Sequence, residues 1–176
     1  MNEFMKQAFS CCEVLQGELT EVLQTFEDGC AFCKVSVTSG GYDFLVNVEL
    51  NEFAKKPCKV GDAIQFKLAL MYTDHGEVYK DEDEFFGGQY GKAYAPESFV
   101  PNTDYDEDGA HEDSSAFVIG KVLSMEEVTL CGDLFAHIKL SCLGCELDLF
   151  AEANGLPKIE IGNIVCGLFD TIGLTF

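Results

Sequence analysis

Apolar and polar residues alternate on both sides of Gly40-Gly41, over residues 31–38 and 43–48. Such alternation is typical of β-strands that bury one face. If the two glycines form a two-residue turn, apolar residues of the two strands meet in pairs on one face. The pairs are Val37 with Phe44, Val35 with Val46, and Cys33 with Val48. The pattern therefore predicts a β-hairpin.

A second alternation surrounds Leu143-Gly144 and predicts a matching hairpin. Its two apolar pairs share one face, and an opposite-charge pair lies on the other face. These pairs are Leu140 with Leu147, Ile138 with Leu149, and Lys139 with Asp148. A shift of one residue would break both sets, which supports this register. Leucine is unsuited to the first position of a tight primed turn, so we expect a bulged or three-residue loop there.

The surroundings of the two hairpins resemble each other at an offset near one hundred residues. The matches are Val22-Leu23 with Val122-Leu123, Phe32 with Phe135, Gly41 with Gly144, and Gly61 with Gly162. Each hairpin is preceded by one strand and followed by a short crossing and a closing strand, over residues 63–70 or 164–168. This order predicts a duplicated unit that curls into a small β-barrel.

The second half carries the clearer motifs, which are I-G-K-V-L-S-M-E-E-V, F-A-H-I-K-L, E-L-D-L-F-A-E and I-E-I-G-N-I-V-C-G. With them the chain resembles a tandem OB-fold (oligonucleotide/oligosaccharide-binding barrel) and is similar to uncharacterised bacterial proteins with repeated barrels. The resemblance covers about residues 17–70 and 117–176. It implies an all-β protein of two OB-like barrels. No fifth strand is readable in either half, so another barrel or a sandwich stays open.

Between the repeats, residues 72–115 are rich in Gly and acidic residues and show no lasting period. We expect an acidic connection, ordered in part by aromatic residues. The expected organisation is therefore a first barrel with an N-terminal extension over residues 1–71, the connection over 72–115, and a second barrel over 116–176.

Within the connection, Asp104, Asp106 and Asp108 precede Gly109 at the spacing that opens a calcium loop. Glu112 stands at the ninth position of such a loop, but the twelfth position holds Ser115 where a bidentate glutamate is required. We therefore expect a hydrated linker and no metal, with calcium binding as the alternative.

Charge narrows the classes of partner. The 176-residue chain has 31 acidic and 11 basic residues and a formal net charge of -20, which repels nucleic-acid phosphates and anionic membrane surfaces. We expect a protein partner, without an identity from the sequence, and a homo-oligomer stays open. No apolar run of about 18 residues and no basic-then-apolar start is present, so we expect a cytoplasmic protein.

The nine cysteines include two C-x-x-C pairs, Cys30 with Cys33 and Cys142 with Cys145. The pairs lie over a hundred residues apart and at different places in the two repeats, so we interpret them as reduced thiols and expect no cofactor. A zinc site and an exported disulfide protein are the alternatives.

The OB resemblance implies a binding face on the outer side of the second and third strands. Its residues would be Phe32, Lys34 and Ser36 in the first repeat and Phe135, His137 and Lys139 in the second. Aromatic and basic residues suit single-stranded nucleic acid, but neighbouring carboxylates neutralise the bases here, so we do not expect nucleic-acid binding.

No catalytic motif accompanies the three histidines, and no catalytic residue is predicted. The sequence therefore indicates a non-catalytic protein-binding or adaptor module. The alternative is an acidic mimic of nucleic acid that occupies a basic DNA-binding protein.

Overall fold

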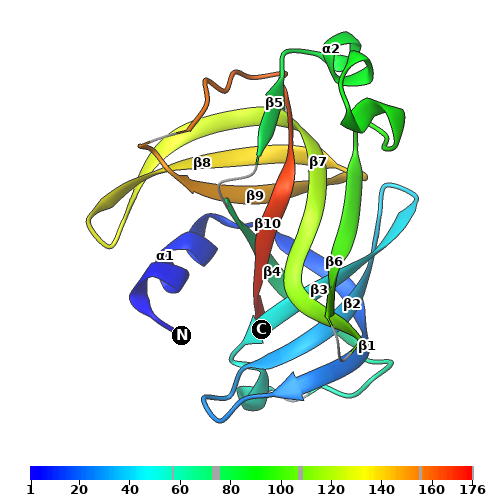
Figure 1. The fold of residues 1–176 in the computed structure, drawn as a ribbon. Helices are drawn as coiled ribbons and strands as arrows, with labels where there is room; N and C mark the ends of the chain where they lie inside the picture. The colour runs from blue at the N-terminus through cyan, green and yellow to red at the C-terminus, as the bar shows by residue number, and fades with distance from the viewer. Residues whose placement is uncertain (57, 73–75, 107–108, 155, 176) are drawn as a thin grey trace.

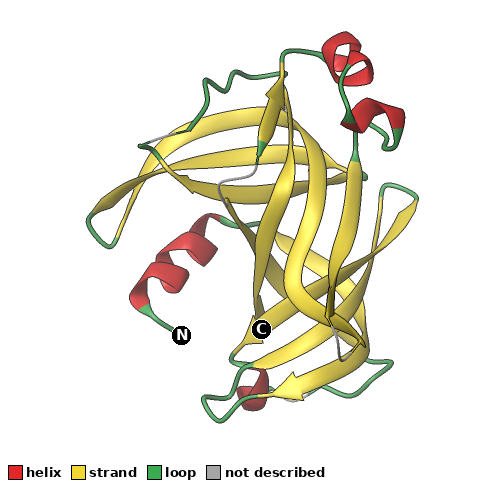
Figure 2. Ribbon diagram, viewed as in Figure 1, coloured by secondary structure: helices red, strands yellow, loops and turns green. Residues whose placement is uncertain are grey.

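The structure is a computed structural model that describes residues 1–56, 58–72, 76–106, 109–154 and 156–175 (Figures 1 and 2). Most of the chain is β-strand. The strands are β1 (Val14–Thr25), β2 (Ala31–Ser39), β3 (Tyr42–Asn51), β4 (Ala63–Tyr72), β5 (Glu77–Tyr79), β6 (Ser98–Asp106), β7 (Gly109–Leu130), β8 (Asp133–Cys142), β9 (Cys145–Glu152) and β10 (Ile164–Thr175). The helices are α1 (Glu3–Cys11), α2 (Glu82–Gly87) and two short 3-10 helices, η1 (Phe53–Lys55) and η2 (Tyr90–Lys92).

The strands pair into one ten-stranded sheet within the described residues, and its pairings close into two five-stranded rings. In the first ring, β1 pairs with β2, β2 with β3, β3 with β10, β10 with β4, and β4 with β1. In the second ring, β7 pairs with β8, β8 with β9, β9 with β4, β4 with β10, and β10 with β7. Strands β4 and β10 therefore belong to both rings.

The sharing follows from the length of β4 and β10. The first half of β4 pairs with β1 of its own repeat, and its second half pairs with β9 of the other repeat. Likewise β10 pairs first with β7 and then with β3. The two second halves lie against each other, with Phe66–Leu70 antiparallel to Thr171–Thr175. Each repeat thus supplies the fifth strand of the other ring, which explains why no fifth strand is readable within either repeat.

Both predicted hairpin registers are confirmed, including the three apolar pairs of β2 with β3 and the opposition of Lys139 and Asp148. The expected bulge at Leu143 is wrong. Cys142 pairs with Cys145 across a two-residue turn, and Leu143 takes a left-handed conformation with φ of 49°. The turn contacts the other hairpin, because Ser39 Oγ donates a hydrogen bond to the Gly144 carbonyl at 2.8 Å. The strained Leu143 therefore lies in a turn that is held by a contact with the other hairpin.

One predicted match between the repeats needs correction. The N–H of Gly61 bonds to the Leu19 carbonyl, and the N–H of Gly162 bonds to the Val122 carbonyl. In each repeat a β-bulge follows the accepting residue, on β1 in the first repeat and on β7 in the second. The two bonds are therefore equivalent and align Leu19 with Val122. The similarity of the dipeptide Val22-Leu23 to Val122-Leu123 therefore does not reflect structural equivalence, whereas the match of Gly61 with Gly162 is confirmed.

The acidic connection contains more regular structure than a linker. Its described residues form β5, α2, η2, β6 and the start of β7, and β6 pairs with β7 up to Asp106 opposite Gly109. The predicted aromatic anchors explain this order, because Phe85 and Phe99 are buried. Tyr90 and Tyr94 pack on Phe117 with ring centroids 5.1 and 5.0 Å apart.

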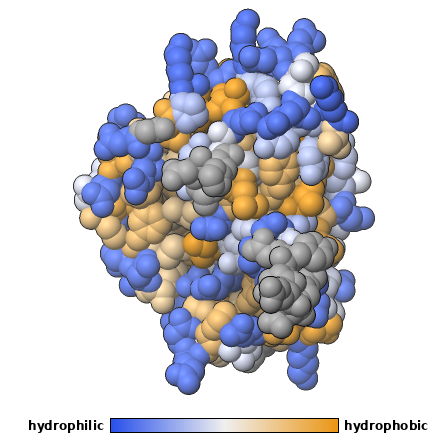
Figure 3. Space-filling model, in the orientation of Figure 1, coloured by the Kyte–Doolittle hydropathy of each residue, from blue (hydrophilic) through white to orange (hydrophobic). Residues whose placement is uncertain are grey.

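The largest cluster of buried apolar residues draws on both repeats, from Leu15 to Phe169. A second cluster lies beneath α1, and a smaller one beneath α2. On the face shown in Figure 3, hydrophobic residues form separate areas between hydrophilic ones. Among the described residues, none of the helices has the length and apolar character that crossing a lipid bilayer requires.

Candidate functional site

Helix α1 covers the predicted binding face of the second repeat (Figure 1). Phe135 is buried in the cluster under the helix, and its ring lies 5.1 Å from that of Phe4. His137 is 3% exposed, and the Lys139 side chain is only partly exposed. The three residues lie on β8 as predicted, but Phe135 and His137 are buried. Phe135 and Lys139 contact the protein's own N-terminal segment.

The helix forms for local reasons that the sequence contains. Asn2 caps it by accepting a hydrogen bond from the Met5 N–H at 2.8 Å. Met5, Ala8, Phe9 and Cys12 recur at helical spacing and form the buried side. At the other end, the Lys67 ammonium donates a hydrogen bond to the Phe9 carbonyl at 2.6 Å. A cation is stabilising there because the C-terminal end of a helix carries a partial negative charge.

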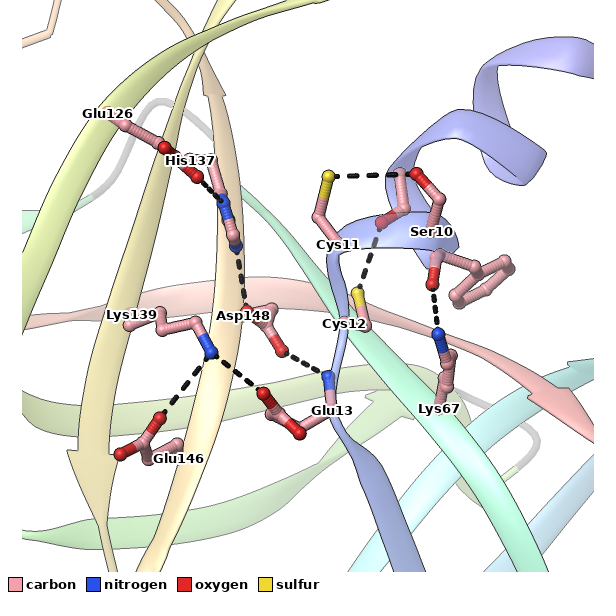
Figure 4. A network of polar contacts seen from close by, with 12 residues as sticks. Ser10, Cys11, Cys12, Glu13, Lys67, Glu126, His137, Lys139, Glu146 and Asp148 are labelled. Carbon is pink, nitrogen blue, oxygen red and sulfur yellow. Dashed lines mark hydrogen bonds and ion pairs between the residues drawn. The ribbon is translucent and has the colours of Figure 1, made fainter.

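A polar network lies where α1 passes into β1 (Figure 4). His137 on β8 lies between two carboxylates, with Nε2 2.7 Å from Asp148 Oδ1 on β9 and Nδ1 3.1 Å from Glu126 Oε1 on β7. The imidazole also stacks on the Phe150 ring at 4.7 Å. Both ring nitrogens are thus engaged, which fixes the orientation of the ring.

Two opposing effects act on the pKa of His137. Burial lowers it, but the hydrogen bonds to Asp148 and Glu126 outweigh burial and raise the pKa above its ordinary value. An imidazolium between two carboxylates satisfies all three groups. The charged form of His137 is therefore stabilised by the fold.

Asp148 also holds the junction of α1 and β1, because its other oxygen accepts a hydrogen bond from the Glu13 N–H at 3.0 Å. Asp148 itself is 2% exposed. At the rim, Lys139 pairs with Glu13 at 3.2 Å and with Glu146 at 3.5 Å. The network therefore ties the N-terminal segment to the β8–β9 hairpin.

Cys12 is the nearest thiol to this network, and it is not prepared for nucleophilic chemistry. Burial, followed by the nearby charge of Asp148, raises the pKa of Cys12 strongly. Its Sγ lies 3.4 Å from the Ala8 carbonyl, to which it can donate. A protonated thiol and a histidine with both nitrogens occupied indicate a structural role, which is to hold the junction of α1 and β1 against the sheet. We call this set of residues the α1 latch: Cys12, Glu13, Glu126, His137 and Asp148.

In the first repeat, the predicted face lies against the β6–β7 hairpin. Lys34 is largely buried and pairs with Glu112 at 2.6 Å and with Glu21 at 3.1 Å. Asn47 donates to the Asn102 carbonyl at 3.5 Å. Phe32 is partly buried on the same strand as Lys34. Part of each predicted face therefore lies against another segment of the same chain, whereas Ser36 lines a pocket.

Of the calcium candidates, Asp104 and Asp106 lie on β6 and Glu112 lies on β7. Asp108 and the side chains of Asp104 and Asp106 lie outside the described residues, and Glu112 is the ion-pair partner of Lys34. The described residues contain no group of three or more side chains of His, Cys, Asp or Glu suited to hold a metal.

The nine cysteines are free thiols, and both C-x-x-C pairs have at least one buried member. Burial raises the pKa of Cys33 and of Cys166 to about 12, and that of Cys145 to about 11. These thiols are protonated at neutral pH and pack as small apolar side chains.

The sequence indicated His137 but not its partners. Asp148 was predicted to face Lys139, and Glu126 and α1 were not identified. The spacing of Met5, Ala8, Phe9 and Cys12 was the signal for an amphipathic helix.

In comparisons with known proteins, neither the family models nor the curated proteins gave a match.

Proposed function

We propose that the protein is a non-catalytic binding module for a basic protein partner. The observation that carries this proposal is the excess of acidic over basic residues, 31 against 11. At least five of the eleven basic residues are already paired with the protein's own glutamates. The large negative field therefore remains available for an external cation-rich surface.

The arrangement of the rings supports tandem OB-like barrels with exchanged fifth strands. Each ring has five strands and begins with a three-stranded antiparallel meander. The faces that such barrels offer to oligonucleotides are covered in part by α1 and by the β6–β7 hairpin. This cover, together with the net charge, favours a protein partner over nucleic acid.

The free thiols support a reducing compartment, and we propose a cytoplasmic protein.

The test is a binding screen with the intact chain at about 0.15 M salt, where the Debye length is about 8 Å. Peptides of equal length that are rich in lysine, neutral, or rich in glutamate are compared, along with a single-stranded oligonucleotide. We expect saturable binding of a subset of lysine-rich peptides and no binding of the oligonucleotide. Binding of the neutral and acidic peptides at equal affinity would contradict the proposal.

An acidic mimic of nucleic acid is the second candidate. It requires carboxylates in a continuous row, as phosphates are on DNA. The exposed acidic residues lie instead on separate elements, such as residues 81–84 at α2, Glu126 and Glu127 on β7, and Glu18 and Glu21 on β1. This spread gives mimicry less support than binding of a basic segment. Competition with DNA for a basic DNA-binding protein would distinguish the two.

A further inference from the structure

Strand β7 has an open edge in its last third. Up to Lys121 this edge pairs with β10, and the Val122 N–H still donates to the Asn163 carbonyl at 2.8 Å. Beyond that point, over residues 123–130, β8 is the only strand with which β7 pairs in the part of the chain that the structure describes. The side of β7 that faces away from β8 therefore presents unpaired backbone.

The direction of these backbone groups follows from the turn that ends β7. Leu130 pairs with Asp133 across the two-residue turn Cys131-Gly132, so Leu130 bonds toward β8. Since residues of an antiparallel strand alternate between bonding toward and away from a neighbour, Met125, Glu127 and Thr129 point their N–H and C=O groups away from β8. Residues 124–130 contain no proline, lysine or bulge that would protect an edge.

A pocket of about 340 Å³ lies beside this edge. Its apolar lining comes from β7, β8 and the crossing before β10, and includes Met125, Ala136, Leu156 and Ile159. Met125 is 46% exposed, although it pairs with the fully buried Ile138. The pocket can accept an apolar side chain from a segment that lies along the edge.

Charge determines which segment fits. Glu126 and Glu127 are adjacent on the edge, and both line the pocket. Glu126 is engaged by His137, whereas Glu127 has no ion-pair partner within the described residues. Lys158, the basic residue of the lining, is paired with Glu160. A second copy of this chain would bring the same carboxylates opposite each other, so a basic segment is the favoured occupant.

We propose that the edge of β7 at residues 124–129 binds an extended, lysine- or arginine-rich segment of a partner protein, which adds a strand to the sheet and places an apolar side chain in the pocket. This inference rests on the proposed function and gives it a site. The backbone groups of Met125, Glu127 and Thr129 supply the hydrogen bonds, and Glu127 selects the basic residues.

The probe is a fluorescent heptapeptide of alternating lysine and apolar residues, measured by anisotropy against the intact chain. Glu127→Pro removes one outward N–H and keeps the bonds to β8. Glu127→Ala removes only the charge, and Glu82→Ala on α2 makes the same charge change at a distant site. We expect losses of affinity of about tenfold for Glu127→Pro and about threefold for Glu127→Ala, with Glu82→Ala close to the wild type.

Because a proline in a strand can disturb folding, the unaltered protein provides a second readout. Addition of the heptapeptide should shift the backbone amide resonances of Met125, Glu127 and Thr129 most strongly. Shifts that cluster elsewhere, or equal affinity of Glu127→Pro and wild type, would overturn the edge site while leaving the proposed function intact. If no lysine-rich peptide of any sequence binds, the proposed function fails as well.

Discussion

Cys131 and Leu143 occupy the first positions of two tight turns, each followed by a glycine, with φ of 53° and 49°. Left-handed backbone is unfavourable for these residue types, and asparagine followed by glycine is the preferred pair in such turns. Leu143 packs against the core, but Cys131 is exposed. Only Cys131 can therefore be replaced without a loss of packing.

We predict that Cys131→Asn raises the free energy of unfolding by about 0.5–1 kcal/mol, because asparagine tolerates the left-handed conformation. The hydrogen bond from the Cys131 N–H to Gln7 Oε1 involves the backbone and is retained. Urea denaturation measures the change. Cys131→Ala is the control and should show no gain; an equal gain in both variants would show that loss of the thiol is responsible.

His137 connects stability to pH. Its pKa is raised in the folded protein by Asp148 and Glu126 against the effect of burial. The stabilisation is therefore complete below the unfolded-state pKa of about 6.5 and is lost as the pH rises through the folded-state value. We predict that stability falls as the pH rises above about 6.5.

His137→Gln should remove this pH dependence and lower stability by about 3 kcal/mol at pH 6, because it leaves a buried carboxylate without its charged partner. Denaturation curves from pH 5.5 to 8.5 measure both effects. An unchanged slope of stability against pH in the variant would show that another group is responsible.

At the scale of elements, Gly173 shows how closely the exchanged strand packs into the first repeat. A Cβ at this position of β10 would lie 2.7 Å from Leu50 Cδ2 and 2.9 Å from Val48 Cγ2, both on β3. These distances are shorter than a normal contact, so the neighbouring side chains would have to move. A residue of the second repeat therefore determines packing in the first.

We predict that Gly173→Ala lowers stability by about 1–3 kcal/mol through overpacking. The methyl resonances of Val48 and Leu50 should shift with it. Gly87→Ala at the end of α2 is the control, since a Cβ there meets no atom within 4 Å. Equal stability of the two variants would contradict the close packing of β10 against β3.

The elements differ in how far the sequence predicts them. Both hairpins were predictable because their turn glycines and alternating residues are close in the chain, as with Val35 opposite Val46. The fifth strands were not, because Gly173 finds its partners over a hundred residues away. At the latch, the sequence predicted that Lys139 faces Asp148. That register also makes His137 a diagonal neighbour of Asp148 on the same face. It could not predict that Asp148 accepts a hydrogen bond from the Glu13 N–H, since that geometry depends on where α1 docks.

At the scale of the whole molecule, the shared strands make the two repeats depend on each other. Neither ring closes without the second half of a strand from the other repeat. The pairing of β7 with β10 closes the second ring and ends at Lys121. The end of β7 beyond this pairing has only β8 beside it in the part of the chain that the structure describes, so its other edge remains open. Exchange between the repeats therefore determines how both rings close and where β7 loses its pairing with β10.

The most direct test is a set of proton–proton nuclear Overhauser contacts across β10 in the intact chain. We predict contacts from residues 172–174 to residues 49–51 on β3 and to residues 67–69 on β4, because these residues are paired in the first ring. The contacts should be present at all protein concentrations. Contacts from residues 172–174 to β7, β8 or β9 alone would show that each repeat closes its own ring, and would contradict the exchange.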